Sequence, residues 1–184
     1  MYRRSSSTTF HGLLLAGGVL IGGSCLAEPF SYDQGALPGA KPWTSADFQN
    51  DPAEFQFVVI GDRTGGANVQ ETFKLAVGQL NLLQPEFVIN VGDIIEGYSD
   101  DKAELNAEWD EVDAMLGELK MPFFRTVGNH DIANEVAKEV WLERHGATRY
   151  AFVYKDTLFV VLDSEDPPRT PPEGIKEKLD EYNR

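Results

Sequence analysis

Three short polar stretches each directly follow an apolar run, and their residue types could bind a divalent metal ion. Carboxylate and amide oxygens and imidazole nitrogens suit hard or borderline ions such as Mn, Fe, Zn or Mg. A single Gly-Asp is also a common turn former and helix cap, so one stretch alone carries little weight. Three such stretches in succession are better explained by one shared site than by chance. The stretches are "GDRTGG" at 61–66, "GDIIEG" at 92–97 and "GNHD" at 128–131, which contribute Asp62, Asp93, Asn129, His130 and Asp131.

The segments around these stretches predict an α/β fold with parallel strands. Apolar runs at 55–60, 87–91 and 123–127 are predicted to be buried strands, and each is followed by a segment with helical spacing. The pattern then changes to two strands around Lys155-Asp156, which predicts a hairpin. The order is therefore βαβαβα followed by a hairpin. Because ligands bind outside the carboxyl ends of parallel strands, we expect the three polar stretches to meet at one edge of the sheet.

The predicted helices have identifiable ends and buried faces. Asn68 is expected to cap the first helix, with Glu71 three residues later and Pro85 after its end. Gly146 is expected to end the third helix, and a fourth is expected to begin near Glu173. The expected apolar faces are Val69, Phe73, Val77, Leu80 and Leu83 for the first helix, and Leu105, Trp109, Val112, Leu116 and Leu119 for the second.

The first 53 residues are predicted to lie outside the folded domain. Residues 1–27 combine two arginines, a short apolar stretch and small residues near Ala27. This pattern predicts a secretory signal peptide and a secreted or periplasmic protein. A twin-arginine signal and a lipoprotein modified at Cys25 are minor alternatives, and an uncleaved anchor is the main one. Residues 28–53 are rich in Pro, Gly, Ser and Asp, which predicts a linker or an extended arm, with the folded domain running from near Glu54 to the last residue.

Composition and charge restrict the function classes. With 184 residues, 42% of them hydrophobic, the chain is long and apolar enough for one globular domain. Its net charge of −14 opposes long-range attraction to nucleic acid. A bound metal ion could still reverse the local field for an anionic substrate. The single cysteine lies in the predicted signal, so the mature domain is expected to have neither a disulfide nor a membrane span.

In order and approximate spacing, the three motifs resemble those of the calcineurin-like metallophosphoesterases. The resemblance covers about residues 55–166, and "YAFVYKDTLFVVLDSED" is similar to the strand pair that follows in that family. It implies a phosphoesterase-type β-sandwich flanked by helices and incomplete in this chain. It also implies two divalent metal ions (Mn, Fe, Zn or Mg) and hydrolysis of a phosphoester substrate.

The resemblance also implies roles for the individual residues. Asp62 would bind the first metal, Asp93 would bridge both, and Asn129 would bind the second through its amide oxygen. His130 would lie near the substrate and protonate the leaving group or stabilise the transition state. Asp131 would orient the imidazole of His130.

The sequence departs from the family pattern at two motifs. Thr64 stands where the family usually has a histidine ligand, and the downstream Gly-His-x-His motif is absent from this chain. We therefore expect weak metal binding and little or no phosphatase activity from the chain alone, either as the N-terminal part of a longer enzyme or as a degenerate homologue. Arg63 is expected to reach a substrate phosphate or to face solvent, and His145 to be a capping or surface residue.

Two other function classes stay open from the sequence. A non-catalytic binding or scaffold protein with a degenerate phosphoesterase fold accounts for Thr64 and the missing histidines, but it gives no reason for His130 beside Asn129. A nucleotide-binding domain that uses "GDRTGG" as a phosphate loop is disfavoured, because the stretch lacks the Lys-Ser/Thr ending and the Gly-x-Gly-x-x-Gly spacing.

Overall fold

The computed structural model describes residues 29–48, 54–64 and 69–168. The predicted signal peptide, the Asn68 cap and the predicted helix near Glu173 lie outside these residues. The described part is a mixed α/β structure with three helices and two small sheets. None of its helices has the length and apolar character needed to cross a lipid bilayer.

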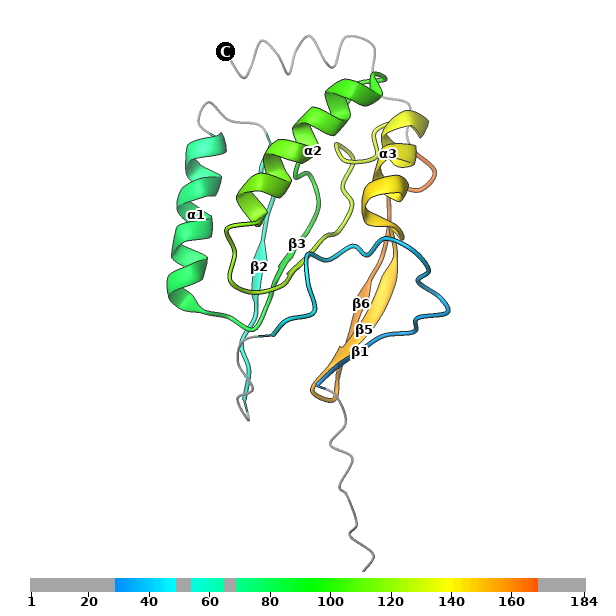
Figure 1. Ribbon diagram of the computed structural model, residues 1–184. Coiled ribbons are helices and arrows are strands. Elements are labelled where there is room, and N and C mark those ends of the chain that lie inside the picture. Colours follow the sequence, from blue (N-terminus) through cyan, green and yellow to red (C-terminus); the bar gives the residue numbers. More distant parts are fainter. Residues whose placement is uncertain (1–28, 49–53, 65–68, 169–184) are drawn as a thin grey trace, which may run out of the picture.

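A parallel sheet with the order β2-β3-β4 lies beneath the helices. Its strands are β2 (Val58–Ile60), β3 (Val88–Asn90) and β4 (Phe123–Phe124). The helices are α1 (Val69–Leu83), α2 (Lys102–Leu116) and α3 (Glu135–His145). Figure 1 shows α2 lying between α1 and α3. The predicted alternation of three strands and three helices is confirmed, although each strand is shorter than its apolar run.

An antiparallel sheet with the order β1-β5-β6 lies beside the first sheet (Figure 1). It consists of β1 (Phe30–Ser31), β5 (Tyr150–Tyr154) and β6 (Thr157–Val161). The turn between β5 and β6 places Lys155 at φ 46° and Asp156 at φ 62°. Two consecutive residues with positive φ are characteristic of the two-residue turns that match strand twist in hairpins. The predicted hairpin is confirmed.

The parallel sheet is covered on both faces, because successive side chains point to opposite sides of a strand. Val88 and Phe123 belong to a core cluster formed with the three helices. Their neighbours Phe87 and Phe124 belong to a second cluster formed with the antiparallel sheet. In this second cluster Phe124 stacks on Phe152 with ring centroids 4.2 Å apart. The described chain therefore has three layers: helices, parallel sheet and antiparallel sheet.

The segment from residue 30 to residue 48 is part of the folded domain, which differs from the predicted start near Glu54. Trp43 is buried in the second core cluster and forms an isolated bridge with Phe124. Phe30 lies 5.1 to 5.9 Å, centroid to centroid, from five other aromatic rings. The segment is extended, and a few aromatic side chains attach it. It therefore has no periodic pattern that would have marked it as core.

Some apolar side chains of the described residues are exposed. On α1, Phe73, Val77 and Leu80 are buried as expected, but Leu83 is 62% exposed. The outward face of β6 and the residue after it expose further apolar groups, namely Leu158, Val160 and Leu162. Strand alternation explains this arrangement, because the intervening side chains of β6 point toward the second core cluster.

Trp43→Ala should destabilise the protein strongly if the segment from residue 30 to residue 48 is part of the core. Removing a buried indole leaves a cavity among aromatic rings, so we expect the free energy of unfolding to fall by about 3 kcal/mol or more. Urea denaturation followed by circular dichroism measures the change. Leu82→Ala is the control, because Leu82 is 85% exposed and its loss should cost no more than about 0.5 kcal/mol. Equal small effects would show that the segment is dispensable.

Candidate metal site at the strand ends

The loops that follow β2, β3 and β4 are joined by hydrogen bonds to Asp93. The backbone N–H groups of Arg63 and Thr64 donate to the Asp93 carbonyl oxygen, with N–O distances of 2.9 and 3.3 Å. The backbone N–H of His130 donates to Asp93 Oδ1 at 2.9 Å. All three predicted loops therefore meet at the carboxyl edge of the parallel sheet, with Asp62 in the first of them.

Two glycines allow the second and third loops to approach each other this closely. A Cβ atom on Gly128 would lie 2.2 Å from Asp93 Oδ1 and 2.6 Å from the Asp93 nitrogen. Gly97 has φ 61°, and a Cβ there would lie 2.0 Å from the His130 carbonyl oxygen. Any larger residue at either position would push the loops apart.

The carboxylate of Asp131 is fully buried between the same two loops. Oδ2 accepts from the backbone N–H groups of Asp93 and Gly128, both at 2.8 Å. Oδ1 accepts from those of Ile94 and Ile95, at 2.9 and 3.3 Å. Burial raises the pKa of Asp131 to about 7, and the hydrogen bonds from Gly128, Ile94 and Ile95 oppose this rise. Asp131 therefore holds the loops together through the backbone.

The imidazole of His130 is oriented by a backbone carbonyl, which differs from the expected contact with Asp131. His130 Nδ1 lies 2.6 Å from the Glu96 carbonyl oxygen, and the ring packs edge-on against Tyr98 with centroids 4.7 Å apart. A carbonyl can only accept, so Nδ1 carries the proton of this hydrogen bond. In the neutral ring, Nε2 then has a free lone pair.

Tyr98 also fixes the amide of Asn129. Asn129 Nδ2 donates to the Tyr98 hydroxyl oxygen at 2.6 Å, and its Oδ1 accepts no hydrogen bond from the described residues. The amide oxygen is thus the end of the side chain available to a metal ion. Sequence reasoning missed Tyr98, although an aromatic residue directly after Gly97 in the same loop as Asp93 was a usable signal.

Arg63 is held inside the protein by three groups. Its side chain is buried, and Nη1 donates to the Ile94 carbonyl oxygen at 3.1 Å. The guanidinium also pairs with Glu111 and lies 5.8 Å from the ring centroid of Phe73. The expected solvent-facing alternative is wrong because the side chain is covered. The predicted contact between Arg63 and a substrate phosphate stays a prediction.

The remaining residues define the donor set of the candidate site. Asp62 is exposed and Thr64 is partly buried.

His145 is 3% exposed and lies against Trp109 and Trp141, so the expected surface position is wrong and the ring belongs to the core. Among residues 29–48, 54–64 and 69–168, no group of three or more His, Cys, Asp or Glu side chains is arranged to hold a metal ion. The candidate ligands Asp62, Asp93 and Asn129 would all bind through oxygen.

No protein-family model matches the chain, and no curated protein matches it significantly.

Asp131→Asn should change the pH dependence of stability in metal-free buffer. With the folded pKa raised to about 7, the stability that Asp131 contributes is fully present below its unfolded pKa of 3.8 and is lost as the pH rises through about 7. Because His145, with its lowered pKa, contributes with the opposite sign, the informative quantity is the difference between wild type and variant. We expect the excess free energy of unfolding of the wild type over the variant to fall by roughly 1 kcal/mol per pH unit between pH 4 and pH 7.

Chemical denaturation with EDTA present, repeated at intervals of half a pH unit, measures this difference. Asp62→Asn changes an exposed carboxylate at the same edge of the sheet and should leave the profile unchanged. A wild-type advantage that grows with pH would mean instead that Asp131 is ionised and is stabilised by its four backbone donors.

Proposed function

We propose that this chain is a metal-dependent phosphoester hydrolase of the calcineurin-like type, exported by the predicted signal peptide. The observation that carries the proposal is the hydrogen bonding of three strand-end loops around Asp93. A turn or cap role for each Gly-Asp would not require backbone contact between the loops. Convergence at the carboxyl edge of a parallel sheet is the usual geometry of a ligand site in α/β proteins.

The oxygen donors at this edge fit a divalent metal ion, although they make an incomplete shell. Asp62 and Asp93 would supply carboxylates, and Asn129 would supply Oδ1, the atom left free by its bond to Tyr98. Oxygen ligands of this kind favour Mg or Mn over softer ions. When bound, the metal would supply Lewis-acid activation of the phosphoester.

His130 is positioned for proton transfer at the same edge. The Glu96 carbonyl accepts from Nδ1–H, so Nε2 is the atom that can take up a proton and pass it to a leaving group. Tyr98 packs against the ring and bonds Asn129, so one side chain orients both the proposed acid and a proposed ligand. Such support around active groups keeps their geometry within the narrow range that catalysis needs.

The layering of the fold also supports the proposal. A parallel sheet lies between helices and a second sheet, as the resemblance to metallophosphoesterases implies for the first part of that sandwich. The phosphoester substrate and the exported location remain proposals based on the motifs and the N-terminal sequence.

Asp93→Asn tests the proposal without removing the hydrogen bond from His130, because an amide oxygen can replace Oδ1 as acceptor. We expect Mn²⁺ affinity to fall at least about tenfold, since the carboxylate charge is lost from the centre of the donor set. Titration of Mn²⁺ followed by electron paramagnetic resonance measures the free ion directly. Turnover of an aryl phosphate by the wild-type chain, expected to be slow, should fall in parallel.

Asp156→Asn is the matched control, because it removes the same charge from an exposed hairpin residue in a conformation that Asn tolerates. Mn²⁺ affinity unchanged in Asp93→Asn would overturn the metal site. Wild-type chain that binds no Mn²⁺ would favour the non-catalytic binding or scaffold protein instead.

A further inference from the structure

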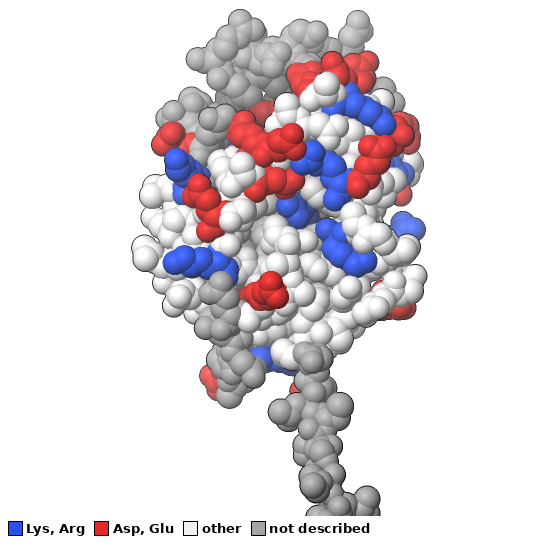
Figure 2. Space-filling model, viewed as in Figure 1, with Lys and Arg blue, Asp and Glu red and all other residues white. Residues whose placement is uncertain are grey.

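A cavity of about 420 Å³ is lined by residues of four parts of the chain, and none of the candidate metal ligands is among them. Trp43 and Thr44 come from the N-terminal segment, Asp113 from α2, Arg125 from the end of β4, and Arg144 from α3. Its volume falls at the lower end of the roughly 300–1,000 Å³ found for small-molecule sites. Figure 2 shows basic side chains gathered near the middle of one face, below a broad group of acidic ones.

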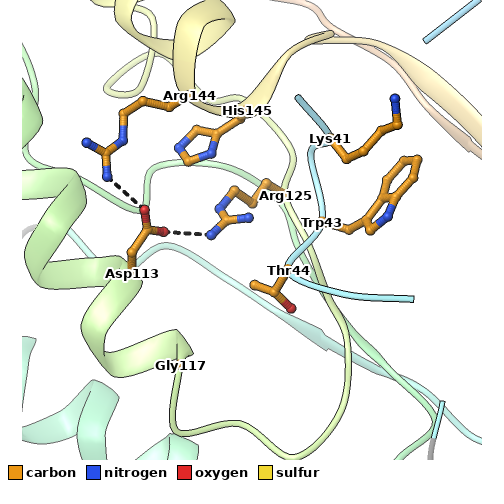
Figure 3. A pocket seen from close by; sticks show the side chains of 8 residues that line it. All are labelled: Lys41, Trp43, Thr44, Asp113, Gly117, Arg125, Arg144 and His145. Carbon is orange, nitrogen blue, oxygen red and sulfur yellow. Dashed lines mark hydrogen bonds and ion pairs between the residues drawn. The ribbon is translucent and has the colours of Figure 1, made fainter. Parts of the chain in front are cut away.

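The cavity contains two guanidinium groups that share one carboxylate. Arg125 Nη2 donates to Asp113 Oδ1 at 2.6 Å, and Arg144 Nη2 donates to Asp113 Oδ2 at 2.8 Å, as Figure 3 shows. Asp110 also accepts from Arg144, but its side chain is 71% exposed, so this pair contributes little. One half-buried carboxylate, that of Asp113, therefore compensates the two cations only in part.

Arg125 is a nearly buried cation with unused hydrogen-bonding capacity. It is 6% exposed, and within the described residues its guanidinium donates only to Asp113, while its Nε is buried without an acceptor. Burial lowers the pKa of Arg125, whereas Asp113 acts in the opposite direction. A buried cation with unused donors is costly unless an acceptor reaches it.

Other buried nitrogens at the cavity also lack a partner, although the remaining nitrogens of Arg144 donate to Asn106, Asp110 and Asp113. The Nε atoms of Arg125 and Arg144 and Nε2 of His145 are all buried without a hydrogen-bond partner. Burial lowers the pKa of His145 to about 3, so its ring is neutral at physiological pH. Lys41 also lines the cavity, but its ammonium binds the carbonyl oxygens of Leu37 and Gly39 and points away from Arg125 in Figure 3.

We propose that this cavity binds a small organic oxyanion, a carboxylate or a phosphate monoester, through the guanidinium groups of Arg125 and Arg144. Oxyanions match the planar fork of arginine, and charge-assisted hydrogen bonds of this kind are about twice as strong as neutral ones. The cavity is larger than a bare inorganic ion needs, and the indole of Trp43 provides an apolar wall for the organic part. The site is separate from the proposed metal centre and does not depend on it.

Isothermal titration of the full chain with benzoate, phenyl phosphate and the neutral benzamide tests the proposal. Protein and buffers are first passed over a chelating resin to prevent metal-dependent binding at the strand-end loops, because soluble EDTA is a polycarboxylate and would compete for the cavity. We expect saturable binding of at least one anion, with benzamide weaker by about tenfold or more. The tighter of the two anions identifies the ligand chemistry. Benzamide that binds as well as both anions, or no saturable binding of either, would overturn the proposal.

Gly117→Glu places a competing carboxylate at the rim, since Gly117 lines the cavity, is exposed and has helical backbone angles. Anion affinity should fall about tenfold or more. Gly78→Glu is the matched control: it makes the same change at an exposed helical position where a Cβ meets no other atom within 4 Å. Unchanged affinity in Gly117→Glu, with both variants folded by circular dichroism, would exclude this cavity as the binding site. An equal loss in Gly78→Glu would exclude it too.

Discussion

The buried carboxylate of Asp131 is the interaction on which the strand-end edge of the sheet depends. Its two oxygens accept four backbone N–H groups from two different loops, so neither loop can move without breaking hydrogen bonds in a region closed to water. A buried carboxylate without these donors would be strongly unfavourable. Asp93, which has φ 54°, adopts a conformation that few non-glycine residues reach, and the Asp131 hydrogen bond to its nitrogen helps to hold it there.

The loops fixed by Asp131 also determine which side chains at this edge can reach a ligand. Because the loops are fixed by backbone hydrogen bonds, the side chains of Asp62 and Asn129 remain exposed at the edge. His130 receives its orientation from a main-chain oxygen, which is insensitive to the protonation of nearby carboxylates. This arrangement separates the structural role, carried by Asp131, from the proposed chemical roles of the residues around it.

Much of the fold was predictable because its signals are local. Apolar runs followed by Gly-Asp or Gly-Asn predicted strand ends, and helical spacing predicted Leu105, Trp109, Val112 and Leu116 as buried. The contacts of Asp131 and His130 were not predictable, because they depend on backbone conformations such as φ 61° at Gly97 that no pattern of side chains encodes. The burial of Trp43 was not predictable either, since its partners in the second core cluster come from the middle and the end of the described chain.

The pairing of β1 with β5 has a consequence for how the chain folds. Phe30 lies opposite Tyr154, so about 120 residues must be synthesised between the two partners before the strand pair can close. The helices and the parallel sheet contain mostly nearer neighbours and can assemble first. Until β5 is available, the aromatic rings of the N-terminal segment have only the parallel sheet to pack on, as Trp43 does against Phe124. We therefore expect β1 to dock on β5 late in folding, while the nascent protein is still open to chaperones and to self-association.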